Sequence, residues 1–144
     1  MNSIELVKSY INNNGFQMLT EGKEHVTFRY QMNLIYYFGN DDEYFQLTLA
    51  DFDLVTKENI SLVKERCNRI NREIRQVKLY INDNRIIANS EIYYKTKEDF
   101  FYQIDIALKN LIKAKVAYAK LLEDEILLLN NRERYTCLHQ KCRK

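Results

Sequence analysis

The segment 67–94 constrains the fold more than any other part of the chain, because its side-chain period changes from helical to extended. Apolar residues recur at helical spacing in a stripe that starts before the segment and continues into it: Ile60, Val63, Cys67, Ile70 and Ile74. Alternation then begins at Val77, Leu79 and Ile81, and the turn Asn82-Asp83-Asn84 leads into a second extended run, 85–94. Asn and Asp tolerate the positive φ that a tight hairpin requires. The segment predicts a helix followed by a β-hairpin.

The predicted helix is amphipathic. Its polar side carries five charged residues that we expect to face solvent: Lys64, Glu65, Arg66, Arg69 and Arg72. Near its C-terminal end, Asn68 and Asn71 are expected to bond the last free carbonyl groups or the following turn.

Residues 3–49 predict a helix and then an antiparallel meander. A helical stripe over 3–14 ends at Gly15, which suits the left-handed residue after a helix. Period-two alternation follows in 16–20, 26–31, 34–38 and 44–49, with turn residues between the runs. One sheet face is expected to pack on helices, and the other, polar or tyrosine-rich, to stay partly open. The candidate contacts on that open face are Arg29, Tyr37, Tyr44 and Gln46.

The last helix is the longest. A capping-box pattern at Thr96–Asp99 starts it, and neither glycine nor proline interrupts it before the pair Asn130-Asn131. At about 1.5 Å per residue, this helix is roughly 50 Å long, whereas a domain of about 110 residues is only roughly 35 Å across. Its buried stripe is expected at Phe100, Ile104, Ala107, Leu108, Leu111, Tyr118, Leu121 and Leu122. The helix should therefore extend beyond its own domain.

The extending part is apolar. The run Ile126-Leu127-Leu128-Leu129 would cost about 1.5–3 kcal/mol for each large side chain left in water. Either the helix bends back over its own domain or a partner covers this end, and we predict a homodimer. The candidate interface residues are Tyr118, Leu122, Ile126, Leu127 and Leu129.

Length and charge predict one domain and a short tail. A chain of 144 residues suits a single core. Residues 130–144 carry five cations and one anion, or +4, so the net charge of +2 leaves about −2 for residues 1–129. We therefore expect a single α+β domain over 1–129 and a flexible basic tail over 130–144.

Little in the sequence indicates catalysis or a bound group. The two histidines, His25 and His139, have no triad-like setting, and no phosphate-binding or zinc-protease motif is present. The aspartates 41, 42, 51 and 53 are expected to serve turns and caps. The cluster Cys137, His139 and Cys142 offers three ligands at irregular spacing, where a structural zinc site needs four. A tail with incidental thiols is favoured over a metal site shared by two copies or a redox-active thiol. We expect a chain that is not an enzyme and needs no cofactor.

Three widely spaced cysteines do not form a disulfide framework. The N-terminal residues lack the pattern of a signal peptide, and no apolar run is long enough to span a bilayer. These features predict a cytoplasmic protein with no membrane contact.

Three stretches of the chain carry a family resemblance, and the first is Phe28-Arg29-Tyr30-Gln31-Met32-Asn33-Leu34-Ile35. It resembles a strand turn of the YbjN-like proteins, small bacterial proteins that carry the label of sensory transduction regulators, with Met32 where a glycine is expected. The other two, 44–50 and 67–81, are similar to the following strand and to a helix-to-strand segment, and the resemblance covers about 4–122. It implies the fold of type III secretion chaperones, a sheet with helices mainly on one face in the order α-β-β-β(-β)-α-β-β-α, and a dimerising, non-enzymatic interaction module.

Two functional hypotheses follow. The first is an adaptor or chaperone-like regulator that binds a protein partner of unknown identity through the sheet face or the long helix. The alternative is a weak nucleic-acid-associated regulator that uses the basic tail. Four net charges with no interleaved aromatic residue beyond Tyr135 would bind nucleic acid weakly, so the first hypothesis is favoured.

Overall fold

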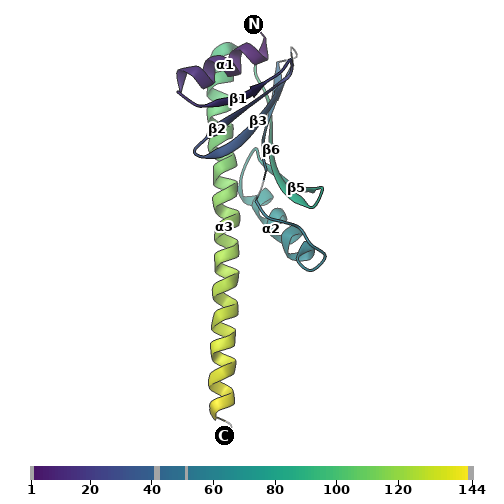
Figure 1. Cartoon of the computed structure of the whole chain (residues 1–144), viewed down its shortest axis with the longest axis vertical. Helices are drawn as coiled ribbons and strands as arrows, with labels where there is room; N and C mark the ends of the chain where they lie inside the picture. The colour runs from purple at the N-terminus through teal and green to yellow at the C-terminus, as the bar shows by residue number, and fades with distance from the viewer. Residues whose placement is uncertain (1, 41–42, 51, 143–144) are drawn as a thin grey trace.

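The computed structural model describes residues 2–40, 43–50 and 52–142, with side chains described as far as Arg134. Helices and strands follow one another in the predicted order, and α3 projects from the rest of the molecule as a single rod (Figure 1). The elements are α1 (Ser3–Asn13), β1 (Met18–Glu21), β2 (His25–Tyr30), β3 (Asn33–Gly39), β4 (Tyr44–Leu49), α2 (Ile60–Glu73), β5 (Lys78–Asn82), β6 (Arg85–Tyr93) and α3 (Lys97–Cys142).

The six strands form one antiparallel sheet in the order β1-β2-β3-β4-β6-β5. The hairpin predicted from segment 67–94 is present: Asn82 pairs with Arg85 across the turn residues Asp83 and Asn84, which have φ of 49° and 61°. The turn between β2 and β3 is equally tight, because Gln31 and Met32 also adopt positive φ, at 48° and 66°. Met32 therefore takes the conformation expected of a glycine there, at a cost of about 1 kcal/mol.

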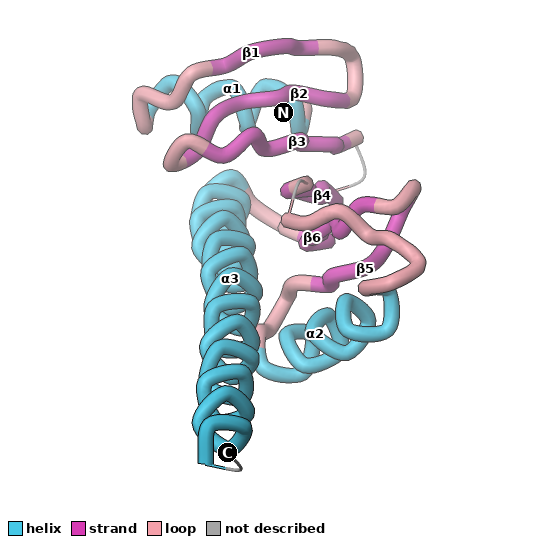
Figure 2. Tube along the Cα trace, turned by 60° about the horizontal axis from the view of Figure 1, so that its bottom comes forward, coloured by secondary structure: helices cyan, strands magenta, loops and turns pink. Residues whose placement is uncertain are grey.

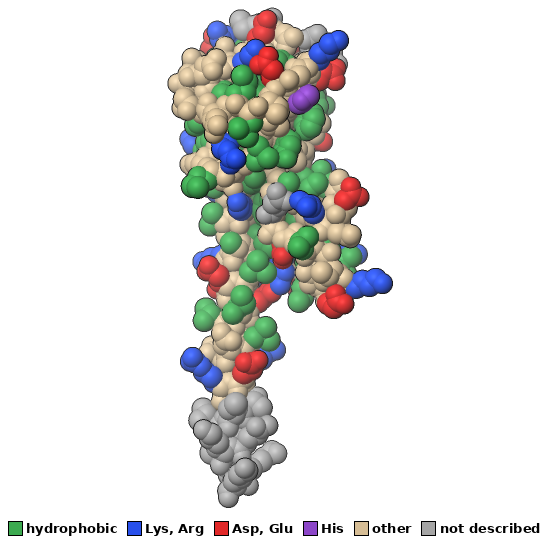
Figure 3. Space-filling model, viewed as in Figure 1, with side chains coloured by type: hydrophobic (Ala, Val, Ile, Leu, Met, Phe, Trp, Pro, Cys, Tyr) green, Lys and Arg blue, Asp and Glu red, His purple; other side chains and the backbone are tan. Residues whose placement is uncertain are grey.

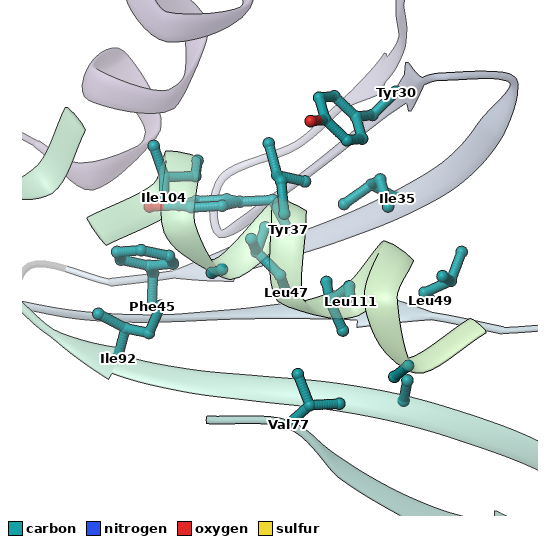
Figure 4. Packing of buried hydrophobic residues seen from close by; sticks show 14 of the residues in the cluster. Tyr30, Ile35, Tyr37, Phe45, Leu47, Leu49, Val77, Ile92, Ile104 and Leu111 are labelled. Carbon is teal, nitrogen blue, oxygen red and sulfur yellow. The ribbon is translucent and has the colours of Figure 1, made fainter. Parts of the chain in front are cut away.

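All three helices lie on one face of the sheet, as predicted (Figure 2). Residues that alternate along the strands point into this layer, so the core lies between sheet and helices. Figure 4 shows buried residues from several strands meeting Ile104 and Leu111 of α3. The fold class is α+β, with a long C-terminal helix and an open antiparallel sheet.

Tyr37 belongs to this core, and its predicted place on the open face was wrong. The β-sheet register pairs Tyr37 with Val26 on β2 and with Leu47 on β4, and both of these side chains are fully buried. Cross-strand partners point to the same face, so Tyr37 must point inward with them. Its hydroxyl bonds the Ser3 hydroxyl and donates to the Ser3 carbonyl at 3.2 Å, which satisfies the polar group in the interior. Burial raises the pKa of Tyr37 well above its ordinary value.

The long helix begins at the predicted cap, Thr96, but the reciprocal bond of the capping box is made to the amide of Lys95 instead of that of Thr96. The Thr96 hydroxyl accepts a hydrogen bond from the Asp99 amide at 3.0 Å, and the Asp99 carboxylate accepts one from the Lys95 amide at 3.1 Å. The expected end at Asn130-Asn131 was wrong, because α3 continues to Cys142. Two asparagines lower helix propensity only slightly, and the residues after them have no glycine or proline to stop the helix. The division of the chain into a domain, 1–129, and a tail, 130–144, stays a prediction.

Candidate functional site

The open face of the sheet presents aromatic and polar side chains from its central strands. Among them, Phe38 and Tyr93 are large and exposed, and Tyr93 keeps 75% of its surface in contact with solvent. The register places Tyr44 opposite Tyr93, with ring centroids 5.1 Å apart, and Gln46 opposite both Phe38 and Glu91. Aromatic side chains among hydrogen-bonding groups are typical of protein-binding surfaces.

Two of the predicted contacts, Tyr44 and Gln46, are therefore neighbours on this face, and Arg29 lies on the same face of β2. Burial, together with the negative charge of Glu91, raises the pKa of Tyr44. Asn89 donates to Gln46 at 3.0 Å and to Thr48 at 2.9 Å, so a polar network fixes the centre of the face. Whether these residues bind a partner stays a prediction.

The edges of the sheet are less suited to binding than its open face. At the β5 edge, the Asn71 side chain accepts from the Leu79 amide at 2.7 Å and donates to the Leu79 carbonyl at 3.0 Å. This amide takes the place of a neighbouring strand and blocks the addition of another. At the opposite edge, β1 has four residues and an irregular register between Met18 and Thr20. Asn71 thus bonds the strand after the turn, close to the role predicted for it.

A partly buried ion cluster joins α2 to α3, and it was not among the predicted sites. Arg66 is 9% exposed; its guanidinium forms a two-point ion pair with Glu125, in which Nε lies 3.0 Å from Oε1. It also donates to the Tyr118 hydroxyl at 3.3 Å, and this hydroxyl in turn donates to Asp53 at 3.2 Å. We call Arg66, Tyr118, Glu125 and Asp53 the clasp.

The expected solvent-facing position of Arg66 was therefore wrong. Arg66 follows Val63 by three positions and precedes Ile70 by four, so it shares a helix face with two buried residues. A long side chain at such a position can bury its stem and carry its charge to an acidic partner. The position of Arg66 on this helix face could have indicated its burial from the sequence alone. Its partner could not be found in that way, because Glu125 is 59 positions away in the sequence.

Electrostatics keeps the clasp charged. The hydrogen bonds from Arg66 hold the pKa of Glu125 below its usual range, and Glu125 in turn raises the pKa of Arg66. Burial raises the pKa of Tyr118 to about 12, so its hydroxyl stays protonated and able to donate to Asp53. These groups satisfy one another and leave no reacting centre, so the clasp is a structural joint.

Beyond Glu125, α3 leaves the body of the molecule, and we call residues 126–142 the overhang (Figure 1). Side chains of Ile126, Leu127, Leu128 and Leu129 are 57–59% exposed, and hydrophobic side chains are visible on the rod below the body (Figure 3). The helix is straight at this point and does not fold back. These four consecutive residues point to different sides of the helix, so the exposed end of the rod is apolar around most of its circumference, and large exposed apolar side chains of this kind mark an interaction site.

Not all the candidate interface residues are available to a partner. Tyr118 is 1% exposed and belongs to the clasp, so its place in an interface was wrong; a helix phase alone does not show where α2 covers α3. Leu122 is half-buried against the core. The exposed residues are Ile126, Leu127 and Leu129, together with Leu128. Their contact with a partner stays a prediction.

The remaining predicted site lies largely outside what the structure describes. Cys137, His139 and Cys142 fall in the helical backbone of α3, but their side chains are outside the described residues. Among the residues that are described, no three His, Cys, Asp or Glu side chains gather into a metal-binding group. Within the same residues, no helix has the length and apolar character needed to cross a bilayer.

Several solved structures share this architecture. Residues of this chain superpose on YbjN of E. coli, a candidate transcription regulator, with a TM-score of 0.62 and 10% identity over 85% of this chain and 93% of that one. The chain has a YbjN-like fold. An uncharacterized protein of Methanothermobacter thermautotrophicus is similar over 84% of this chain and 96% of its own, with a TM-score of 0.57 and 16% identity.

The YbjN-like fold is also that of a secretion chaperone. The Yersinia pestis type III secretion chaperone SycH, solved in complex with a stable fragment of YscM2, has a TM-score of 0.56 and 11% identity over 80% of this chain and 98% of its own. No protein-family model and no curated protein sequence matches the chain. At identities this low the likeness establishes the fold alone.

Proposed function

We propose that this YbjN-like protein is a non-enzymatic interaction module, an adaptor or chaperone-like regulator that binds a protein partner on its open sheet face. The observation that carries the proposal is the aromatic and polar composition of that face, where Phe38, Tyr44 and Tyr93 lie among hydrogen-bonding neighbours. The closed edge at Asn71 favours binding by side chains on the face over the addition of a strand at β5.

The second part of the proposal is that the protein acts as a homodimer in the cytoplasm. The four exposed apolar residues 126–129 support a second copy as the cover of the overhang. Cys67 is buried as a free thiol, and burial raises its pKa, so it acts as an inert apolar residue suited to a reducing compartment.

Affinity capture from the native cell tests the partner-binding part. The wild-type chain is compared with a double variant of the open face, Phe38→Ser with Tyr93→Ser, and with a control, Tyr102→Ser, which alters an exposed aromatic residue on α3 instead. We expect one protein to co-purify in stoichiometric amount with the wild type and the control, and to be lost from the double variant. Capture that is equal for all three chains, or no reproducible partner, would overturn the proposal.

The nucleic-acid alternative is tested by removing the basic end. Arg132 and Arg134 are exposed on the overhang, and three further cations follow them in the sequence. Deletion of residues 130–144 would abolish binding to a DNA or RNA duplex under the alternative, and would leave partner capture intact under the adaptor proposal.

A further inference from the structure

A second apolar surface lies on α3 beside the turn between β2 and β3. It is a groove of about 610 Å³, bounded by α3 on one side and by Tyr30 and Gln31 on the other. Its apolar lining comes mainly from α3: Ile106, Ile112, Val116 and Ala117. Val116 is 61% exposed, so within the described residues this groove is without a cover.

We propose that this groove receives the overhang of a second copy of the chain, so that two α3 helices pair in antiparallel orientation. The inference rests on the homodimer of the proposed function and specifies its geometry. Leu127 and Leu128 of each copy enter the groove of the other.

Helix phase places the groove and these leucines along one side of α3. Leu127 and Leu128 follow Val116 and Ala117 by 11 positions, and 11 residues make about three turns of an α-helix. One side of α3 therefore carries the groove where the helix packs on its own domain, and the two leucines on the overhang. A partner that lies along this side can bury both features at once.

The positions of these residues along α3 also fit a dimer with twofold symmetry. When two α3 helices cross between Val116 and Ala117, Leu127 of one copy lies opposite Ile106 of the other, because 106 and 127 are equally far from 116.5. Each copy then supplies one groove and fills one groove. Such an interface is closed, and it gives a dimer in place of a filament.

Charge favours the antiparallel orientation. Lys109 and Lys113 line the groove, and Glu123 and Asp124 precede the leucines that would enter it. The same crossing point sets Asp124 of one copy opposite Lys109 of the other, since 109 and 124 are also equally far from 116.5.

One pair of like charges opposes the proposed dimer, and one lysine of the groove already has a partner in its own chain. Lys113 falls opposite Lys120, and both residues are exposed, which weakens their repulsion. Lys109 also binds Asp105 within its own chain, at 2.8 Å. In a parallel, in-register pair each charged residue would lie opposite the same residue of the other copy. Like charges would then repel, so the parallel orientation is less favourable.

Disulfide cross-linking tests the orientation. In a chain with Cys137→Ser and Cys142→Ser, we introduce Val116→Cys near the crossing point or Leu127→Cys on the overhang. The antiparallel pair brings two copies of position 116 within reach of a disulfide, whose Cα atoms lie about 4.4–6.8 Å apart. Two copies of position 127 would be roughly 30 Å apart, at about 1.5 Å per residue.

We expect Val116→Cys to form a covalent dimer on mild oxidation and Leu127→Cys to form none with itself. A mixture of Leu127→Cys and Ile106→Cys should form the mixed dimer. Self-linking of Leu127→Cys would overturn the antiparallel geometry and leave the homodimer standing. A monomer by light scattering at about 100 µM would overturn both, while the open-face capture experiment still tests partner binding by itself.

Charge exchange gives an independent readout. Lys109→Asp and Asp124→Lys should each weaken the dimer about threefold in Kd, as expected for an exposed ion pair, and the double variant should recover the wild-type Kd. The control Lys64→Asp changes an exposed cation on α2 and should leave the Kd unchanged. Additive losses in the double variant would overturn the proposed pairing.

Discussion

The two halves of α3 differ in what surrounds them, although both are apolar. From Phe100 to Glu125, one stripe of the helix meets the sheet, α1 and α2; its large residues are buried as far as Tyr118, and Leu121 and Leu122 are half-buried. From Ile126 to Leu129, the same helix carries large apolar residues that remain more than half exposed. The first half is explained by the fold of this chain, whereas no described part of the same chain covers the second. Apolar periodicity along a helix therefore shows which residues are to be buried and leaves open what buries them.

The largest expected difference between the halves is in folding stability. Phe100→Ala removes a fully buried ring that contacts Phe45, Tyr94 and Phe101, and should lower the free energy of unfolding by about 3–5 kcal/mol. The matched change in the overhang, Leu128→Ala, should lower it by less than about 0.5 kcal/mol in the monomer. Urea unfolding at a concentration below dimer formation measures both. Equal losses would mean that the overhang packs on its own domain.

The clasp marks where the packed half ends, and breaking it should have a smaller effect. Arg66→Met keeps the apolar stem and removes the charge, and should cost about 2 kcal/mol, because Tyr118 and two carboxylates lose a charged partner. Arg69→Met is the control: Arg69 pairs with Glu73 at 3.2 Å on an exposed helix face, where ion pairs contribute less than about 0.5 kcal/mol.

Hydrogen exchange of α2 would show whether Arg66→Met releases this helix from α3. If the two arginine variants lose equal stability, the clasp does not join the helices.

The smallest expected effect is a pH dependence at the same boundary. Arg66 lowers the pKa of Glu125 in the folded protein, so the unfolded chain binds a proton at Glu125 more readily than the folded chain does. The contribution of Glu125 to stability is therefore full above its unfolded pKa of about 4.3 and is lost as the pH falls through the lower folded value.

Glu125→Gln should remove this part of the pH dependence. Unfolding curves of the two proteins between neutral pH and about pH 3 should differ most at neutral pH and converge at acid pH. A constant difference across that range would show that Glu125 acts through packing alone.

The fold follows closely from local patterns. The Asn82–Asn84 turn, the alternating strands and the helix cap at Thr96 each act within a few residues, and each is present in the structure. Local patterns were insufficient where the direction of a side chain depends on residues far away in the sequence. In β3 the runs Leu34, Tyr36, Phe38 and Ile35, Tyr37 are both apolar, and only pairing with Val26 and Leu47 decides that Tyr37 points inward.

The candidate surfaces also differ in whether the sequence could predict them. That α3 extends beyond its domain could be foreseen, because the length of a helix follows from the number of residues in it and the size of a domain from its chain length. The closed edge at Asn71, the clasp at Arg66 and the groove beside Tyr30 could not, because each joins residues from different elements.

The sequence by itself determined the order of the elements, the tight turns, the helix-covered sheet and the length of the apolar rod, because short-range periodicity and turn chemistry fix these properties. Only the tertiary structure decided which face of β3 is buried, where α2 covers α3 and which surfaces of α3 remain exposed. Those outcomes depend on sheet register and on contacts between residues far apart in the chain, such as Arg66 and Glu125.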